Sequence, residues 1–379
     1  MTQDKPSQTI GTVGIIGGGQ LAQMLASSVR HLGIKCTVLD PNPACCATNE
    51  LGQCDRITAD YNDEQALIKL AQSCDVVTYE FENVPGQGAA LIADHGSIHP
   101  SPQALSTSQD RLSERAMFKE LGIPVPPFAQ VDSLDQLIQS LKQLGAPSIL
   151  KARTLGYDGK GQVLISDPSK AAQALETLGK VPAILDGFIE FDRELSIIAT
   201  RSINGQIEYY PLSENIHRGG ILRLTKAPAR QVHEAVANKA RNSIKKILEH
   251  FDYVGTLAVE FFQVGQGADA KLLANEIAPR VHNTGHWTIE GTKTSQFENH
   301  MRAVLGMELG SAKPAGHSAM INLIGNEPRA GSMDAMPNAN VHLYGKEPRP
   351  GRKIGHITLN APTEQELDAM LERFTRIVG

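Results

Sequence analysis

The chain has 379 residues, of which 41% are hydrophobic and 20% are charged, and its net charge is −5. This length exceeds what one ordinary hydrophobic core organises, so we expect two or three domains. The slightly acidic balance without a basic stripe argues against nucleic acid as a partner, and no apolar run approaches the roughly 20 residues that span a membrane. Residues 1–10 are polar and predict a short disordered lead-in with no signal peptide, so we expect a cytoplasmic protein.

Strands and helices alternate in the first part of the chain. The segments with strand or helix periodicity are strands at 12–17, 36–40 and 75–79 and an amphipathic helix at 20–32. Gly33 ends that helix, and Pro100 and Pro102 mark the exit from this part. Such alternation predicts a doubly wound, Rossmann-like parallel sheet, which we assign to residues 11–105.

The middle of the chain follows an α+β pattern. Helices are expected at 109–121, 133–144 and 231–250, and strands, several joined by hairpin-like turns, at 148–152, 162–166, 183–189, 195–202, 206–212 and 256–262. We assign residues 106–305 to this second domain. The remaining residues, 306–379, are expected to form a small α+β domain with strands at 319–324, 341–344 and 353–360 and a helix at 364–378.

The five cysteines all lie in the first fifth of the chain, and their number is odd. No pair has Cys-x-x-Cys spacing. A zinc site built from Cys45, Cys46 and Cys54 is an alternative, but reduced structural thiols are the simpler interpretation, and we predict no metal there.

A first glycine-rich loop, Gly17-Gly18-Gly19-Gln20-Leu21-Ala22, joins an expected strand to an expected helix. It fits the dinucleotide pattern G-x-G-x-x-A, and Asp40 ends the next strand, where such enzymes keep a ribose-binding acid. Taken alone, the motif indicates an NAD- or FAD-dependent oxidoreductase. Any doubly wound sheet also needs a tight turn here, so another phosphorylated or ribosylated ligand stays open.

A second glycine-rich loop lies between two expected antiparallel strands, where Lys151 precedes Gly156-Tyr157-Asp158-Gly159-Lys160-Gly161-Gln162. Three glycines in six residues suit a flap that closes over a triphosphate, with Lys151 as a point charge for the phosphates. The alternative is a flexible hairpin tip with an unrelated lysine.

The segment 275–287 concentrates polar groups after a buried-looking strand that carries one acid, Glu260. It contains Glu276, Arg280, two histidines and the only tryptophan of the chain. Two acids on neighbouring apolar strands, followed by arginine and histidine, suit a magnesium–polyphosphate site beside an anion pocket. This pair decides the interpretation of the second loop, because a triphosphate needs magnesium.

Together these residues resemble the ATP-grasp family, and within it the N5-carboxyaminoimidazole ribonucleotide synthetases of purine biosynthesis. The motifs that carry the resemblance are 17–21, 80–82, 110–111, Lys151, 156–162, 276–287 and 349–356. The resemblance implies three domains, a homodimer, ATP and Mg²⁺ (or Mn²⁺) as cofactors, and aminoimidazole ribonucleotide and bicarbonate as substrates.

The resemblance also implies roles at the nucleotide. Arg111 and Lys151 would contact the ATP phosphates under the flap, which consists of Gly156, Tyr157, Asp158, Gly159, Lys160, Gly161 and Gln162. The adenine hinge would be Asp186, Gly187, Phe188 and Ile189, and the remaining nucleotide contacts would be Glu194, His217 and Asn275. Glu260 and Glu276 would bind the metal. The family's hinge often begins with Glu, and Asp186 is shorter, so backbone groups could hold the adenine edge instead.

The other implied roles concern the substrates. Arg280, His282 and Asn283 would hold bicarbonate and the carboxyphosphate formed from it. The ribonucleotide pocket would be lined by Gln20, Leu21, Glu82, Asn283, Arg352 and Lys353. We expect four residues to take part in the chemistry itself: Asp158, Arg280, His282 and Lys353.

Three rival interpretations stay open on the sequence. A dinucleotide-dependent oxidoreductase would use the Gly17 loop but leaves the second loop and the acid pair unexplained. Another ATP-grasp ligase would share the scaffold and differ in its acceptor. A regulator without activity would bind ATP and never hydrolyse it.

Overall fold

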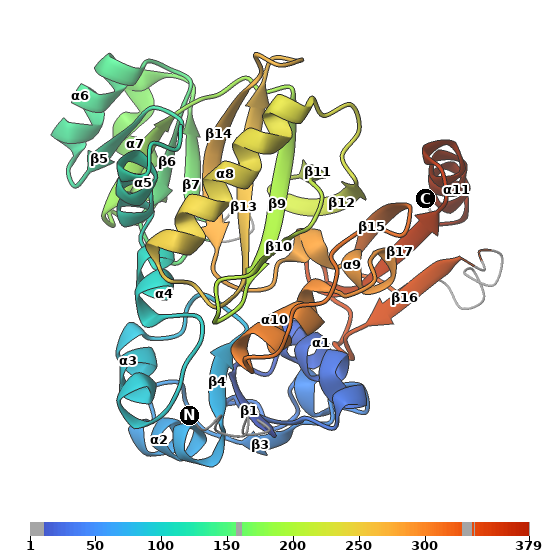
Figure 1. Ribbon diagram of the computed structural model, residues 1–379. Coiled ribbons are helices and arrows are strands. Elements are labelled where there is room, and N and C mark those ends of the chain that lie inside the picture. The colour runs from blue at the N-terminus through green and yellow to red at the C-terminus, as the bar shows by residue number, and fades with distance from the viewer. Residues whose placement is uncertain (1–10, 157–160, 328–335, 337, 379) are drawn as a thin grey trace, which may run out of the picture.

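The computed structural model describes residues 11–156, 161–327, 336 and 338–378. Over these residues the chain forms three sheets with helices packed against them (Figure 1). The N-terminal sheet lies at the bottom of Figure 1, and a small and a large antiparallel sheet lie above it. The expected combination of an α/β part with α+β parts is confirmed.

The N-terminal sheet has four strands in the order β3-β2-β1-β4, all paired in parallel. Its elements are β1 (Thr12–Ile16), α1 (Gln20–Val29), β2 (Lys35–Leu39), β3 (Asp55–Ile57), α2 (Glu64–Ser73), β4 (Val76–Tyr79) and α3 (Gly86–His95). A 3₁₀ turn extends α1 to Gly33, whose positive φ of 73° ends the helix as predicted. The short strand β3 was not predicted, because Asp-Arg-Ile has no apolar pattern.

The connection to the small sheet differs from the single helix expected at 109–121. The structure has two helices, α4 (Pro102–Gln109) and α5 (Arg111–Glu120), which meet at Asp110. Asp110 has an extended backbone, and its carboxylate accepts hydrogen bonds from the amides of Leu112 and Ser113. An N-cap of this kind starts a new helix. The helix expected at 109–121 is confirmed by α5 to within two residues, and α4 was not predicted.

The small sheet has four antiparallel strands in the order β5-β8-β6-β7. Its elements are β5 (Phe128–Val131), α6 (Leu134–Leu144), β6 (Ser148–Ala152), β7 (Gln162–Ile165), α7 (Ala171–Thr177) and β8 (Ala183–Gly187). β6 and β7 pair directly, so the second glycine-rich loop connects neighbouring antiparallel strands, as predicted.

The large sheet has nine strands in the order β14-β13-β9-β11-β12-β15-β17-β16, with β10 paired to β9. Its strands are β9 (Arg193–Arg201), β10 (Ile207–Tyr209), β11 (Ser213–Arg218), β12 (Ile221–Ala227), β13 (Gly255–Val264), β14 (Lys271–Ala278), β15 (His317–Ile324), β16 (Ala339–Leu343) and β17 (Lys353–Ala361). Its helices are α8 (Glu234–His250), α9 (Thr288–Gly291), α10 (Gln296–Val304) and α11 (Glu364–Val378). Because β12 pairs with β15, the C-terminal strands extend the same sheet. The domain boundaries at 105 and 305 stay predictions.

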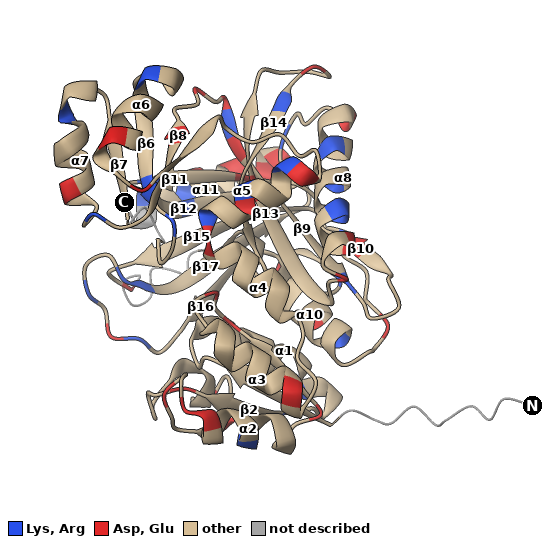
Figure 2. Ribbon diagram, turned by 90° about the vertical axis from the view of Figure 1, so that its left-hand side faces the viewer, with Lys and Arg blue, Asp and Glu red and all other residues tan. Residues whose placement is uncertain are grey.

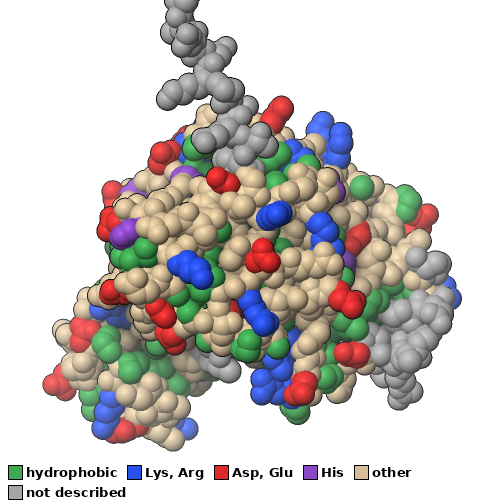
Figure 3. All heavy atoms as spheres, turned by 90° about the horizontal axis from the view of Figure 1, so that it is seen from below, with side chains coloured by type: hydrophobic (Ala, Val, Ile, Leu, Met, Phe, Trp, Pro, Cys, Tyr) green, Lys and Arg blue, Asp and Glu red, His purple; other side chains and the backbone are tan. Residues whose placement is uncertain are grey.

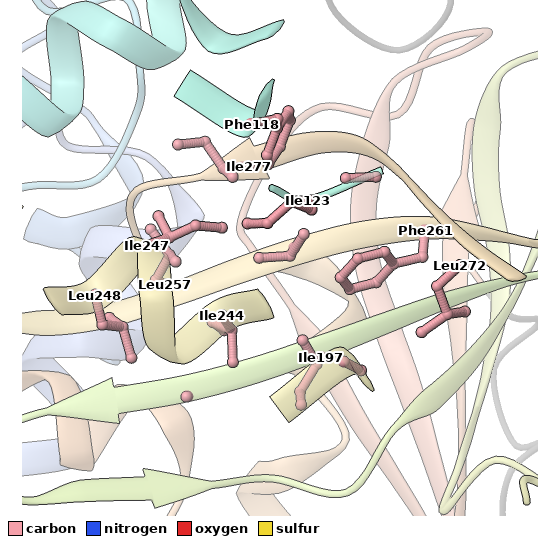
Figure 4. Close-up of a cluster of buried hydrophobic side chains, with 14 of the residues drawn as sticks. Phe118, Ile123, Ile197, Ile244, Ile247, Leu248, Leu257, Phe261, Leu272 and Ile277 are labelled. Atoms are coloured by element: carbon pink, nitrogen blue, oxygen red, sulfur yellow. The ribbon is translucent and has the colours of Figure 1, made fainter. Parts of the chain in front are cut away.

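Helix α8 shows how the sequence builds the largest core cluster. Its buried residues are Val236, Ala240, Ile244, Ile247 and Leu248, a spacing that places them on one helix face. Figure 4 shows the last three of these directed at side chains of β9 and β13. Burial of each Ile or Leu side chain contributes about 1.5–3 kcal/mol, which fixes the helix on the sheet that carries the acid pair.

The surface carries charges of both signs. Figure 3 shows Lys, Arg, Asp and Glu side chains interspersed over the face seen from below. Among the helices of the described residues, none has the length and apolarity needed to cross a bilayer.

Candidate active site

A cavity of about 690 Å³ lies where the N-terminal sheet, the small sheet and the large sheet approach one another. It brings together most of the residues expected from the sequence. Those that line it are Gln20, Leu21, Glu82, Arg111, Lys151, Gly156, Gln162, Glu194, His217, Glu260, Asn275, Glu276, Arg280, His282, Asn283 and Lys353. Figure 2 shows acidic and basic positions close together on the ribbons around β13 and α5.

Some expected residues do not line this cavity. These are Gly161, Asp186, Gly187, Phe188, Ile189 and Arg352. The expected flap residues Tyr157, Asp158, Gly159 and Lys160 lie outside the described part of the chain.

The acid pair lies on neighbouring strands. Glu260 on β13 and Glu276 on β14 are direct partners in the antiparallel register, next to a β-bulge that follows Glu260. Burial, and then the like charge of Glu276, raise the pKa of Glu260 to about 8. Two carboxylates in this arrangement suit Mg²⁺, which usually takes one or two protein carboxylates and completes its shell with water and phosphate oxygens. The described residues contain no cluster of three or more His, Cys, Asp or Glu that could hold a metal.

Two histidines face these acids. His217 forms an ion pair with Glu194. Burial lowers the pKa of His217, but the contact with Glu194 and the charges of Glu260 and Glu276 together outweigh burial and raise it. His282 Nε2 lies 3.7 Å from Glu260 Oε1. The amide of Thr284 donates to His282 Nδ1, so the ring proton of the neutral imidazole is on Nε2, toward the acid. Burial, followed by the charges of Arg280 and Lys353, lowers the pKa of His282 well below its usual range.

Arg280 lies beside Glu82, at the side of the cavity formed by the N-terminal sheet. Its Nη2 is 2.7 Å from Glu82 Oε1, and its Nη1 donates to the carbonyl of Val281. Its Nε is buried and has no hydrogen-bond partner among the described residues. A buried guanidinium donor without a partner suits an anionic ligand.

Asp186 occupies a different place from the one expected. Its carboxylate lies 2.9 Å from Lys151 Nζ and 3.1 Å from Arg115 Nη2, and it is buried. Burial opposes its ionisation, but these two cations outweigh burial and hold its pKa below the usual range. Because the side chain is directed at these cations, any contact of the hinge with adenine would fall to backbone groups, and that contact stays a prediction.

The first glycine-rich loop contradicts the dinucleotide interpretation. The Gly18 amide donates to Asp40 Oδ2 at 2.7 Å, and the amides of Gly19 and Ala22 donate to the buried carboxylate of Glu80. The amides that would cradle a pyrophosphate are therefore bonded to the chain's own acids. The supposed ribose acid, Asp40, also accepts a hydrogen bond from the Tyr61 hydroxyl.

Sequence reasoning missed several residues of the site. Phe191 and Phe262 line the cavity, and their rings stack with centroids 4.7 Å apart. Glu114 also lines it, and burial raises its pKa to about 7. Glu114 and its neighbour Arg115 look like an ordinary charged helix face in the sequence, so only their burial against β14 marks them.

The fold and the site together define an ATP-grasp ligase, and comparison with protein families agrees. Residues 116–297 match the ATP-grasp domain, and residues 10–109 match the ribonucleotide synthetase preATP-grasp domain. Residues 318–370 match the phosphoribosylaminoimidazole carboxylase C-terminal domain. Within this class, the chain belongs to the N5-carboxyaminoimidazole ribonucleotide synthase family.

Similar proteins cover nearly the whole chain. The N5-carboxyaminoimidazole ribonucleotide synthase of Pseudomonas aeruginosa is 44% identical over 97% of this chain and 99% of its own length. The crystal structure of the synthetase from Thermus thermophilus is 47% identical with a TM-score of 0.91, covering 97% of this chain and 98% of that one. The Aspergillus clavatus enzyme, solved with ADP and 5-aminoimidazole ribonucleotide, is 32% identical with a TM-score of 0.88, covering 98% and 99%.

Proposed function

We propose that this enzyme carboxylates 5-aminoimidazole ribonucleotide with bicarbonate and converts ATP to ADP and phosphate, as a step of purine biosynthesis. The observation that carries the proposal is one cavity lined by two sets of groups. Lys151 and the acid pair suit a magnesium–triphosphate, and Gln20, Glu82 and Lys353 suit a second, polar substrate.

The reaction follows from the chemistry of bicarbonate, which is a poor electrophile. An oxygen of bicarbonate attacks the γ-phosphorus of ATP, the bond to the bridging oxygen of ADP breaks, and carboxyphosphate forms. The exocyclic amine of the ribonucleotide then attacks the carboxyl carbon, or CO₂ released from it. Phosphate leaves and the amine loses a proton.

The residues of the cavity fit the charges of these steps. Lys151 and Arg280 would stabilise negative charge on the phosphoryl group and on carboxyphosphate. The buried Nε of Arg280 supplies a donor for that anion. His282, with its proton on Nε2, would donate a hydrogen bond to bicarbonate or carboxyphosphate without adding a positive charge to the site. Asp158, outside the described residues, is expected to orient the amine or accept its proton.

The remaining expectations are part of the same proposal. Mg²⁺, or Mn²⁺, would be held by Glu260 and Glu276 and would neutralise charge on the phosphates. Bicarbonate as the carboxyl source, assembly as a homodimer and a cytoplasmic location stay predictions.

The test is phosphate release from Mg-ATP, with and without the ribonucleotide and bicarbonate. We expect turnover that requires the ribonucleotide and falls by about 10²–10³-fold in Glu276→Gln, because one metal ligand loses its charge. Glu249→Gln is the matched control, since Glu249 lies exposed on α8 and pairs only with Lys245 among the described residues. Phosphate release that is indifferent to the ribonucleotide would leave the ATP-grasp class standing and disprove this acceptor.

A further inference from the structure

Arg115 has a position that the proposed reaction leaves unexplained. It lies on α5, is only 1% exposed, and is not among the residues that line the cavity. Its guanidinium nevertheless contacts both sheets that meet at the nucleotide side of the cavity. A fully enclosed arginine between two sheets restricts how those sheets are placed relative to one another.

The first contact is with the large sheet. Arg115 Nη1 donates to the carbonyl oxygen of Asn275 at 2.5 Å, and the neighbouring Glu114 accepts from the amide of Ile277 at 2.7 Å. β14 is the edge strand of this sheet, so these backbone groups have no strand partner on their outer side. The two side chains of α5 therefore hold the backbone on both sides of Glu276.

The second contact is with the small sheet. Arg115 Nη2 lies 3.1 Å from Asp186 Oδ2 on β8, and Lys151 Nζ on β6 lies 2.9 Å from the same oxygen. The side chain of Lys151 is 12% exposed and lines the cavity. Asp186 thus transmits the position of a buried arginine to a lysine that faces the nucleotide.

Stability alone does not account for this network. Arg115 Nε and Asp186 Oδ1 are buried and have no hydrogen-bond partner among the described residues. Incompletely paired buried charges carry a desolvation penalty, and apolar replacements of such pairs are often equally or more stable.

We propose that Arg115 is a positioning residue for nucleotide binding. Through Asp186 it places Lys151, and through the Asn275 carbonyl it places Glu276, so that the phosphate-binding cation and the metal-binding acid keep a set separation. This inference rests on the proposed function in that Lys151 and Glu276 act on the magnesium–nucleotide. Arg115 itself does not line the cavity, so it would act through these two neighbours.

The experiment measures Mg-ADP binding by calorimetry, without ribonucleotide, for the wild-type chain and Arg115→Met. We expect the Kd for Mg-ADP to rise by about 10-fold or more, because misplacement of binding groups by about 1 Å can cost that much. Arg115→Lys keeps the positive charge but loses the planar guanidinium that bonds both sheets at once. Its Kd for Mg-ADP is therefore expected to lie between those of the wild type and Arg115→Met. The KM for the ribonucleotide should stay within about two-fold of wild type, since Arg115 holds groups of the nucleotide side only.

Two further variants separate positioning from folding. Arg201→Met removes an arginine that bonds the Tyr253 carbonyl and pairs with Asp252, away from the cavity, and it should leave Mg-ADP binding unchanged. Asp186→Asn keeps the shape of the side chain that lies between Arg115 and Lys151 and removes its charge, so it should weaken Mg-ADP binding. This variant tests the inference even if Arg115→Met fails to fold. The unfolding temperature of every variant is measured alongside.

The outcomes are distinct. If Arg115→Met and Asp186→Asn lower the unfolding temperature and leave the Kd for Mg-ADP within about two-fold, the network is structural only and the inference is overturned. If the wild type binds Mg-ADP but releases no phosphate with the ribonucleotide, the proposed function fails. The Kd for Mg-ADP of Arg115→Met relative to wild type then still tests the positioning role of Arg115. A wild-type chain that binds no Mg-ADP would overturn both.

Discussion

The two glycine-rich loops contain the same residue for different physical reasons. In the first loop the glycines are required by packing, because a Cβ on Gly18 would overlap Cys45 Sγ, and the loop's amides are bonded to Asp40 and Glu80. In the second loop Gly161 has a positive φ of 69° with ordinary space around it, and Gly156 lines the cavity. The glycines of the first loop are therefore held by contacts within the protein, while Gln20 and Leu21 of that loop line the cavity. The second loop borders the cavity at Gly156, on the side where we propose that the nucleotide binds.

This difference shows what a glycine pattern leaves undecided. Spacing identifies where the backbone turns sharply or comes close to another group. It does not say whether that group is a ligand or a carboxylate from the same chain. Glu80, which caps the first loop, lies 61 residues from Gly19, and its role is visible only once β4 lies beside β1.

Among the changes that compare the two loops, the largest effect is expected beside the second loop. Lys151→Met removes the cation that we propose faces the nucleotide, and we expect kcat/KM for ATP, measured on folded protein, to fall by about 10²-fold. The unfolding temperature should fall as well, because the buried Asp186 loses one of its two cationic partners. Lys180→Met is the control, because the side chain of Lys180 is 64% exposed and pairs only with Glu176 among the described residues. If kcat/KM for ATP fell equally in Lys151→Met and Lys180→Met, the claim that the region of the second loop serves the nucleotide would be wrong.

Substitution of the acid that caps the first loop should act on stability instead. In Glu80→Gln the amide group would face either the Gly19 or the Ala22 amide, donor against donor, inside a buried site. We expect the free energy of unfolding to fall by about 2 kcal/mol. Urea unfolding measures this loss, and the KM for ATP should be unchanged in the folded fraction. An altered KM for ATP with unchanged stability would mean that the first loop serves the nucleotide after all.

A glycine pair sharpens the same point. Gly18→Ala introduces a Cβ against Cys45 and should destabilise the fold by about 1–3 kcal/mol. Gly86→Ala, at the start of α3, meets no atom within 4 Å and has no positive φ, so it should be neutral or stabilising by up to about 1 kcal/mol. Thermal unfolding measures the change in stability of each variant, which should be a loss for Gly18→Ala and no loss for Gly86→Ala. Similar changes in both variants would contradict the packing argument for the first loop.

The smallest effect concerns the join between the N-terminal sheet and the large sheet. His300 is buried, accepts from the Thr256 amide at Nδ1 and lies with Nε2 2.8 Å from the Thr78 hydroxyl. Burial, and then the nearby His99, lower the pKa of His300 from its ordinary 6.5 to about 3. Because the folded-state pKa is the lower one, this contribution to stability is complete above pH 6.5 and is lost as the pH falls toward 3.

Between pH 7.5 and pH 5.5 we therefore expect His300 to account for a loss of about 1.4 kcal/mol in the free energy of unfolding. His300→Gln keeps the site neutral and should flatten the pH profile by that amount, which urea unfolding at several pH values measures. An unchanged profile would assign the acid sensitivity to other buried groups.

The regular elements could be predicted where one face is apolar and caps are present. The periodicity of α8 and the Ser133 cap of α6 identify both helices. The hairpin of β11 and β12 was missed, because strands such as Ser-Glu-Asn-Ile-His-Arg carry many polar residues that the sheet and the cavity accommodate. Helix α4 was also missed, because only Ala104 and Leu105 of its residues are buried and its sequence shows little apolar periodicity.

The sequence by itself determined the class of the protein, and it predicted site residues most of which the fold brings to one cavity. Some residue types have few chemical uses in such segments, so the carboxylates of Glu260 and Glu276 indicate cation binding and the guanidinium of Arg280 indicates anion binding before their positions in the fold are known. Only the tertiary structure decided which charges oppose one another: Asp186 against Lys151 and Arg115, and Glu80 against the first loop. Those pairings join residues tens of positions apart, and their strength depends on burial, which local sequence does not contain.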